Sequence, residues 1–364
     1  MTSSSTGAQQ GPSLPWRVTS SLVMGISSTI SKIFLFGLNR TEVIGLQDFL
    51  KVLDDRADPA KRQRGLITVS NHISVLDDPV LWGVLPLKYL YNPQNLRFGL
   101  GAHDICFTNK AFASFFTYGQ VLPTHRLKHS EQGGLFQPTF SEAIRLLSTH
   151  PSFRTHSPLS LSNYPPTYST NGTDVVPCPS VHQRNSNAWV HVFPEGAVHQ
   201  HADVDCRYFK WGVSRLILES EPAPDVVPIF IDGFQQVMPE DRVFPRFLPR
   251  IGKRIKVAFG QKLDGESAFG DLRRRWRKLV ESRGGPGNEP GVIRDKRLRD
   301  GEEAREIRVE VAKRVRDEVM RLRSQLGYKE ANPSYGFAET WAKDPKSSRK
   351  RYRSEVDGSL INQD

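Results

Sequence analysis

His72 and Asp77, with four residues between them, are the residues whose types and spacing best suit catalysis in this sequence. A carboxylate that holds one imidazole nitrogen leaves the other free to take a proton from a hydroxyl group. The pair follows the apolar run 66–70 and precedes Asp78 and Pro79, which we expect to be the N-cap and first position of a helix. His72 is therefore predicted to lie in a strand-to-helix turn. A polar turn histidine beside a capping carboxylate is the alternative.

Three further apolar runs end in polar or charged residues, as the run before His72 does. They cover residues 118–126, 188–196 and 226–233. Each is typical of a buried strand that breaks at a turn. Because strand ends carry the site in open α/β sheets, we expect the four turns to converge. The sequence thus predicts an α/β fold in which a mixed sheet is covered by helices.

These four blocks, in this order, resemble those of the glycerolipid acyltransferase superfamily. His72 and Asp77 match its His-(four residues)-Asp pair, and residues 193–196 match its Phe-Pro-Glu-Gly block. Within the superfamily the chain is similar to the tafazzin family over residues 16 to 262, with one interruption. The segments that carry this closer similarity are 70–72, 77–79, 81–83, 102–108, 189–196, 209–212 and 245–247.

The resemblance implies CoA-independent exchange of fatty acyl groups between phospholipids and lysophospholipids, such as cardiolipin and monolysocardiolipin. It also implies that no cofactor is needed, and that the protein is associated with mitochondrial membranes facing the intermembrane space. An acyl-CoA-dependent 1-acylglycerol-3-phosphate acyltransferase would use the same His72 and Asp77. A non-catalytic scaffold that binds membranes is an alternative of another class.

Acyl transfer between oxygens needs a base for the attacking hydroxyl and a proton for the leaving oxygen. His72 can supply both in turn, while Asp77 fixes its tautomer and stabilises the imidazolium. The sequence contains no Gly-x-Ser-x-Gly elbow. We therefore expect direct transfer between two bound lipids, without a serine acyl-enzyme.

Five further residues are candidates for substrate binding. Arg126, which follows Gly119, matches the position where related acyltransferases hold a phosphate, and a guanidinium suits bidentate phosphate binding. An exposed loop arginine is the alternative. The turn Pro194-Glu195-Gly196 ends a buried strand. Gly196 can let backbone N–H groups approach an anion, and Glu195 can position a glycerol hydroxyl or orient Arg126.

Two histidine-containing segments resemble metal or catalytic sites without the expected partners. His199, His201, Asp203 and Asp205 alternate, as ligands on one face of a strand do, but no second ligand pair accompanies them. We therefore predict no metal. His103 and Asp104 lack the spacing of a base pair, so a supporting role is expected.

The formal net charge of +11 favours an anionic partner. Nucleic acid is not expected, since no zinc-finger spacing, RNA-binding signature or helix-turn-helix pattern is found. An anionic membrane surface is the remaining candidate. The three cysteines are too few and too scattered for a disulfide framework or a zinc site.

Changes in composition divide the chain into four parts, the third of which contains an insertion. Residues 1–15 are polar and predicted to be disordered, and 16–38 are expected to form an amphipathic helix at the membrane interface. Residues 39–262 form the predicted acyltransferase domain, interrupted by a low-complexity insertion at 151–187 that we expect to be a disordered loop. Residues 263–364 are predicted to be a charged helical extension.

Two segments combine an apolar stripe with flanking charges. No run of eighteen apolar residues occurs, so a conventional spanning helix is not expected. In 18–38 the stripe consists of Leu22, Ile26, Ile30 and Ile33, and a second stripe lies in 207–220. Membrane contact and packing on the domain both explain such stripes. The main anchor could be either segment.

The charged helix expected at 302–326 has a stripe of Val311, Val315, Val319, Leu322 and Leu326. The stripe allows packing on the domain, self-association into a homo-oligomer, or contact with a membrane. The pattern does not choose among them.

Overall fold

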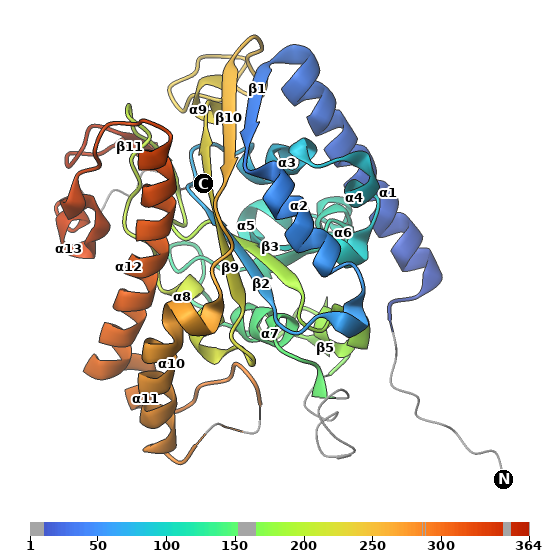
Figure 1. Cartoon of the computed structure of the whole chain (residues 1–364), viewed down its shortest axis with the longest axis vertical. Coiled ribbons are helices and arrows are strands. Elements are labelled where there is room, and N and C mark those ends of the chain that lie inside the picture. Colours follow the sequence, from blue (N-terminus) through green and yellow to red (C-terminus); the bar gives the residue numbers. More distant parts are fainter. Residues whose placement is uncertain (1–10, 152–164, 286, 288, 345–350, 364) are drawn as a thin grey trace.

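The computed structural model describes residues 11–151, 165–285, 287, 289–344 and 351–363. Its centre is a seven-stranded sheet in the order β1-β10-β9-β2-β7-β3-β4 (Figure 1). The five strands from β9 to β4 are parallel, whereas β10 and β1 run in the opposite direction. The strands are β1 (Arg40–Ile44), β2 (Leu66–Ser70), β3 (Phe98–Ala102), β4 (Val121–Thr124), β7 (Trp189–Val192), β9 (Asp225–Asp232) and β10 (Arg254–Phe259).

Helices cover both faces of this sheet, which confirms the predicted mixed α/β architecture (Figure 1). One face carries α2 (Leu46–Asp55), α3 (Asp77–Leu81), α4 (Leu87–Leu90) and α6 (Lys110–Tyr118), with α1 (Leu14–Ile33) packed outside them. The other face carries α7 (Pro138–Leu147), α8 (Gly212–Glu219), α10 (Gly265–Glu281) and α12 (Glu302–Gln325). Short helices are α5 (His103–Cys106), α9 (Phe234–Val237), α11 (Lys296–Asp300) and α13 (Ala338–Trp341).

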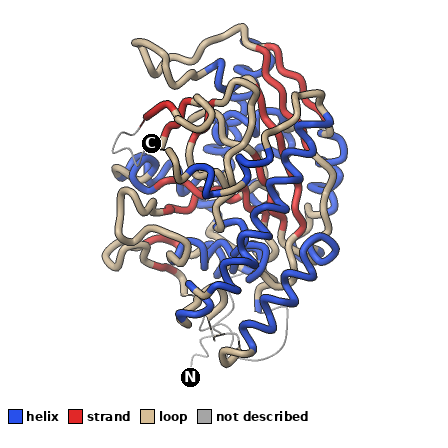
Figure 2. The backbone as a smooth tube through the Cα atoms, turned by 90° about the vertical axis from the view of Figure 1, so that its left-hand side faces the viewer, coloured by secondary structure: helices blue, strands red, loops and turns tan. Residues whose placement is uncertain are grey.

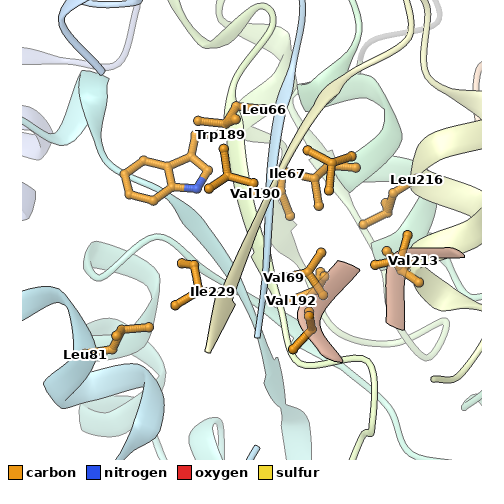
Figure 3. Packing of buried hydrophobic residues seen from close by; sticks show 14 of the residues in the cluster. Leu66, Ile67, Val69, Leu81, Trp189, Val190, Val192, Val213, Leu216 and Ile229 are labelled. Carbon is orange, nitrogen blue, oxygen red and sulfur yellow. The ribbon is translucent and has the colours of Figure 1, made fainter. Parts of the chain in front are cut away.

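The apolar runs form strands that are buried on both faces, as expected of a covered parallel sheet. Alternate residues point to opposite sides (Figure 3). Leu66 and Trp189 lie toward Leu81 of α3, while Val69 and Val192 lie toward α8. The central strand β2 lies between β9 and β7. Its carboxyl end, where the His72 turn begins, is thus beside the carboxyl end of β7.

The C-terminal part belongs to the same structural unit as the rest of the chain. Phe269 and Trp276 of α10 and Val311 and Val319 of α12 are buried in the core cluster that includes the sheet. The helix predicted at 302–326 is confirmed, and its stripe packs against β9 and α8. Residue 262 therefore does not separate a domain from an extension.

Two other expectations from the sequence are corrected. The stripe in 207–220 is core, since Val213, Leu216 and Ile217 of α8 are almost fully buried, so a membrane-interface role for this segment is wrong. Residues 165–187 of the expected disordered insertion contain the hairpin β5 (Thr167–Tyr168) and β6 (Val176–Pro177). The remaining insertion residues 152–164, and 1–10 of the expected N-terminal disorder, lie outside the described residues.

The helix expected at 16–38 is confirmed as α1 followed by a π-helical turn, Phe34–Leu38. Its inner face contacts α3, α4 and α6, while apolar residues remain exposed on its outer face. By length and composition alone, the segment Leu14–Gly37 could cross a membrane. The outer residues are Leu14, Val18, Leu22, Ile26, Ile30, Ile33 and Phe36, each at least 47% exposed.

A second, three-stranded sheet joins residues that are far apart in the sequence. Strand β8 (Val198–Gln200), just after the Phe-Pro-Glu-Gly turn, pairs with β12 (Leu360–Asn362), which pairs with β11 (Arg351–Arg353). Figure 2 shows short strands separate from the main sheet beside the C-terminal end of the trace. Because the N–H of His199 in β8 donates to the carbonyl of His72 at 2.8 Å, β12 lies one strand away from the His72 turn.

Candidate active site

His72 and Asp77 are in direct contact. Nδ1 of His72 lies 2.8 Å from Oδ2 of Asp77, whose side chain is fully buried, whereas 22% of the His72 side chain is exposed. With Nδ1–H donating to the carboxylate, Nε2 keeps its lone pair for an incoming hydroxyl group. The ring also stacks on Phe193, with 4.5 Å between centroids, which restricts its rotation. The predicted pair has the geometry of an oriented general base.

The backbone of the turn holds Asp77 in place. Its Oδ2 accepts the amides of Ile73 and Ser74 at 2.6 and 2.9 Å. Burial raises the pKa of the Asp77 carboxyl, and the hydrogen bonds from His72 and the two amides oppose that rise. Helix α3 begins at Asp77 itself with Leu76 as N-cap, so the expectation that Asp78 caps this helix is wrong.

The neighbouring Asp78 has a different task. It accepts two hydrogen bonds from the guanidinium of Arg97, at 2.8 and 3.1 Å, and one from the indole of Trp82. Burial favours its neutral form, but the charge of Arg97 and these hydrogen bonds lower the pKa of Asp78 below its usual value. Asp78 thus anchors α3 to the start of β3, while Asp77 serves the histidine.

Glu195 supports the His72 turn instead of facing a substrate position. One oxygen accepts the backbone N–H of His72 at 2.8 Å, and the other accepts that of Arg207 at 3.0 Å. The side chain is fully buried, and its second oxygen lies 3.4 Å from Nδ1 of His199. Glu195 therefore does not orient Arg126, nor is it free for a glycerol hydroxyl. It ties the turn after β7 to the turn after β2.

Behind Glu195 lies a residue that the sequence analysis missed. Asp357, from the turn before β12, accepts from Nε2 of His199 at 2.8 Å. Burial disfavours the imidazolium, but the two carboxylates outweigh it and raise the pKa of His199. The same contacts lower the pKa of Asp357, although burial opposes this. Because the partners are 158 positions apart in the sequence, no local pattern could have indicated the pair.

The segment that resembled a metal site has other contacts. His199 is held by two carboxylates, whereas Nδ1 of His201 accepts the backbone N–H of Asp203. Their side chains do not converge on a common point. Among the described residues, the group close enough to share an ion is His103, His125 and Asp174.

That second group is already satisfied by hydrogen bonds. Both oxygens of Asp174 accept from Ser169 or Thr170, and Nε2 of His125 lies 2.7 Å from the Thr170 hydroxyl. The rings of His103 and His125 stack with centroids 4.3 Å apart. The arrangement joins the 165–187 hairpin to the loop before Arg126, which agrees with a supporting role for His103.

Cations gather beside the Phe-Pro-Glu-Gly turn. Lys210 donates to the carbonyls of this turn, with its backbone N–H to Pro194 at 2.8 Å and its ammonium to Gly196 at 3.2 Å. Its side chain is accessible but densely surrounded, and desolvation together with the charges of Arg207 and Arg126 lowers the pKa of Lys210 to about 8. The sequence analysis did not single out Lys210. Such crowded positive charges suit an anionic ligand.

The other predicted binding residues have mixed outcomes. Arg126 pairs with Asp104 and donates to the backbone carbonyl of Gln363, so its guanidinium is partly engaged by the protein. Gly196 has a φ of +60°, a backbone conformation that favours glycine, while the nearest atoms to a Cβ there belong to the flexible side chain of Lys210. Gly119 is the C-cap of helix α6, immediately ahead of β4.

Two cavities, of about 400 and 270 Å³, lie elsewhere in the molecule. The first is lined by the start of α1 together with Tyr91 and Arg184, and the second lies between α10 and α12. Neither includes His72 or Asp77. The predicted pair is instead accessible through the exposed part of the His72 side chain.

Comparison with known proteins identifies the family of this chain. Residues 51–232, which contain the His72 and Glu195 turns, match the acyltransferase family model. The fold and the site therefore define an acyltransferase. The chain is 36% identical to tafazzin of Saccharomyces cerevisiae over 323 residues, which cover 85% of this chain and 79% of the yeast protein. The chain belongs to the tafazzin family of the glycerolipid acyltransferase superfamily.

Two further relatives align with this chain over a smaller share of their own length. Tafazzin of Drosophila melanogaster is 32% identical over 73% of this chain and 57% of its own length. N-acylphosphatidylethanolamine synthase of Arabidopsis thaliana is 33% identical over 55% of this chain and 56% of its own length. The chain thus spans little more than half of these two proteins. The yeast alignment is too long to end at residue 262, so the similarity extends into the C-terminal part.

Proposed function

We propose that this protein exchanges fatty acyl groups between phospholipids and lysophospholipids without CoA, and that monolysocardiolipin is an acceptor, so that cardiolipin is remodelled. Membership of the tafazzin family supports the reaction class. The observation that carries the proposal is the contact between the buried Asp77 and His72, whose side chain remains 22% exposed.

The proposed reaction has two proton transfers through one nitrogen. Nε2 of His72 takes the proton of the lysophospholipid hydroxyl as its oxygen attacks the ester carbonyl of the donor phospholipid. The imidazolium, stabilised by Asp77, then returns the proton to the departing glycerol oxygen as the old ester bond breaks. One ester forms and one is lost, so neither a cofactor nor an acyl-enzyme is required.

The cations beside the Phe-Pro-Glu-Gly turn supply the proposed headgroup site. Lys210 and Arg207 lie close enough to repel one another, and a lipid phosphate would relieve this repulsion. Arg126 contributes positive charge, although Asp104 partly neutralises it. We therefore assign phosphate binding mainly to Lys210, with Arg126 at the edge of the site.

Helix α1 suits a position in the membrane interface. Its outer stripe is exposed, and the Ser31 hydroxyl donates to the carbonyl of Pro79 at 2.8 Å. Pro79 belongs to α3, the helix that starts with Asp77. The proposed membrane contact is thus one helix away from the catalytic pair. The family resemblance makes mitochondrial membranes facing the intermembrane space the proposed location.

The test is acyl transfer with purified protein, labelled phosphatidylcholine and monolysocardiolipin, with and without acyl-CoA. Labelled cardiolipin should form in the absence of acyl-CoA, and His72→Ala should abolish its formation while leaving vesicle binding intact. Strict dependence on acyl-CoA would instead identify the acyl-CoA-dependent acyltransferase. Vesicle binding without any transfer by the intact protein would identify a scaffold.

A further inference from the structure

The connection between α9 and β10 exposes a group of large apolar side chains. Val243, Phe244, Phe247, Leu248 and Ile251 are 59 to 87% exposed, all within nine residues. Single exposed apolar residues are ordinary on a soluble surface, but a contiguous cluster of this size marks a surface that binds something. We call residues 243–251 the apolar loop.

The apolar loop is an ordered structure, with its polar groups turned inward. The guanidinium of Arg242 donates to the carbonyls of Arg246 and Pro239, and it lies beside the buried carboxylate of Glu240. Arg246 donates in turn to the Glu240 carbonyl. The arginine side chains thus point inward and donate hydrogen bonds to backbone carbonyls of the loop. The aromatic and aliphatic side chains point outward. A loop built only to face water would have the opposite arrangement.

This loop is joined to the end of the N-terminal helical segment. The N–H of Gly252 donates to the carbonyl of Leu38 at 2.8 Å, and the N–H of Lys253 donates to Oδ1 of Asn39 at 2.9 Å. Figure 1 shows the α9–β10 connection and the end of α1 at the same end of the molecule. The exposed stripe of α1, through Phe36 and Leu38, therefore continues into the apolar loop.

The charges beside the loop indicate what covers it. Among the described residues, the side chains of Arg250, Lys253 and Arg254 form no ion pair with a carboxylate. Unpaired cations flanking exposed aromatic side chains match the layers of a bilayer, in which anionic headgroups lie above acyl chains. A second copy of this chain would need carboxylates opposite these cations, and the loop itself has only Asp241 exposed beside it.

We propose that the apolar loop inserts into a lipid bilayer that contains anionic lipids, and that it forms one continuous docking surface with the outer stripe of α1. A surface that extends from α1 into the apolar loop fixes the orientation of the molecule on the membrane better than a single helix, which can roll about its own axis. The Asp77-bearing helix α3, which touches α1, is then held at a constant distance from the bilayer surface.

The test is cosedimentation of the full chain with vesicles of phosphatidylcholine, with or without phosphatidylglycerol. The double variant Phe244→Ser/Phe247→Ser should lower partitioning onto the mixed vesicles about tenfold or more, since two aromatic side chains lose their insertion energy. The matched control is Val175→Ser/Phe337→Ser, which removes two exposed apolar side chains from other surfaces and should bind as the unaltered protein does. Thermal unfolding of each variant shows that the fold is kept.

A charge variant, Arg250→Gln/Lys253→Gln, should bind vesicles of pure phosphatidylcholine as the unaltered protein does. It should lose most of the increase in vesicle binding that phosphatidylglycerol produces. Unchanged vesicle binding by the Phe244/Phe247 variant would overturn the proposal. A change in oligomeric state of that variant without loss of vesicle binding would do the same, by identifying a second copy as the occupant. Binding is measured without acyl donors, so the result does not depend on the proposed acyl transfer.

Discussion

The carboxylate of Asp357 lies 2.8 Å from the imidazole of His199, and this contact connects the end of the described chain to the catalytic turn. His199 lies against Glu195, and Glu195 accepts the backbone N–H of His72. Four residues from three distant segments thus form one chain of contacts, in which each member fixes the next. The position of the proposed base, His72, thus depends on Asp357, which lies well outside the matched region 51–232.

Asp357→Asn should destabilise the protein, because it leaves a buried imidazolium with one carboxylate fewer. Breaking a buried charge pair typically costs about 3–5 kcal/mol, and thermal unfolding should show a clear fall in Tm. Transfer activity should fall through kcat more than through KM, because His72 loses support while the headgroup site is unchanged. Asp357→Glu should restore part of both. Glu355→Gln, an exposed acid in the same segment, is the control and should change neither.

The Tm difference between the unaltered protein and Asp357→Asn should depend on pH. The raised pKa of His199 means that its stabilising charge is fully present below about pH 6.5, the ordinary histidine value, and is lost as the pH rises through its folded value. The lowered pKa of Asp357 means that its contribution is present above about pH 4 and is lost in acid. The difference should be largest between these limits. An equal difference at all pH values would show that the pair does not act through charge.

Asp77→Asn and Asp78→Asn should separate catalysis from stability. Asp77→Asn leaves His72 without its carboxylate, and kcat should fall about a thousandfold to ten-thousandfold. Asp78→Asn removes the partner of Arg97, so Tm should fall, with a smaller effect on kcat. Acyl transfer and thermal unfolding of both variants make the comparison. Equal losses of kcat would show that the two aspartates do not have different tasks.

Lys210 should make the binding of anionic lipids sensitive to pH. Its pKa of about 8 means that the ammonium loses its proton as the pH rises above that value, so the headgroup site loses a charge. KM for monolysocardiolipin should rise several-fold from about pH 7 to pH 9, whereas Lys210→Arg, which stays protonated, should keep KM constant. A flat KM in the unaltered protein would remove Lys210 from the binding site.

The C-terminal helix α12 can be tested with two valines on its opposite faces. Val311 is fully buried in the shared core, whereas Val309 is 46% exposed. Val311→Ala should lower the free energy of unfolding by about 1–3 kcal/mol, while Val309→Ala should change it by less than about 0.5 kcal/mol. Denaturant titration measures both. Equal, small effects would mean that α12 is an independent extension after all.

The sequence was sufficient for features that are local in the chain. The spacing of His72 and Asp77 falls within one turn, and the apolar runs around Ile67 and Val190 have the length of buried strands, so the pair and the sheet were predictable. The capping role of Asp78 was mistaken because adjacent carboxylates look equivalent until Arg97 is placed beside one of them.

Features that depend on distant contacts could not be predicted. An amphipathic stripe has the same pattern whether it packs on a core, as in α8, or faces outward, as in α1. The partners of Glu195 were missed because Arg207 and His199 contact it only once the strand β8 has folded back. The sequence does not show that apolar residues such as Phe244 are exposed, because exposure depends on which neighbours pack against them.

The pairing of β12 with β8 has a consequence for the order in which parts of the site are synthesised and folded. Because β12 follows β8 by more than 150 residues, the His72 turn and the sheet strands are synthesised well before Asp357, which lies behind them in the folded protein. Competence for acyl exchange should therefore arise only after β12 has been synthesised and has paired with β8, when the membrane-facing surfaces have already been made.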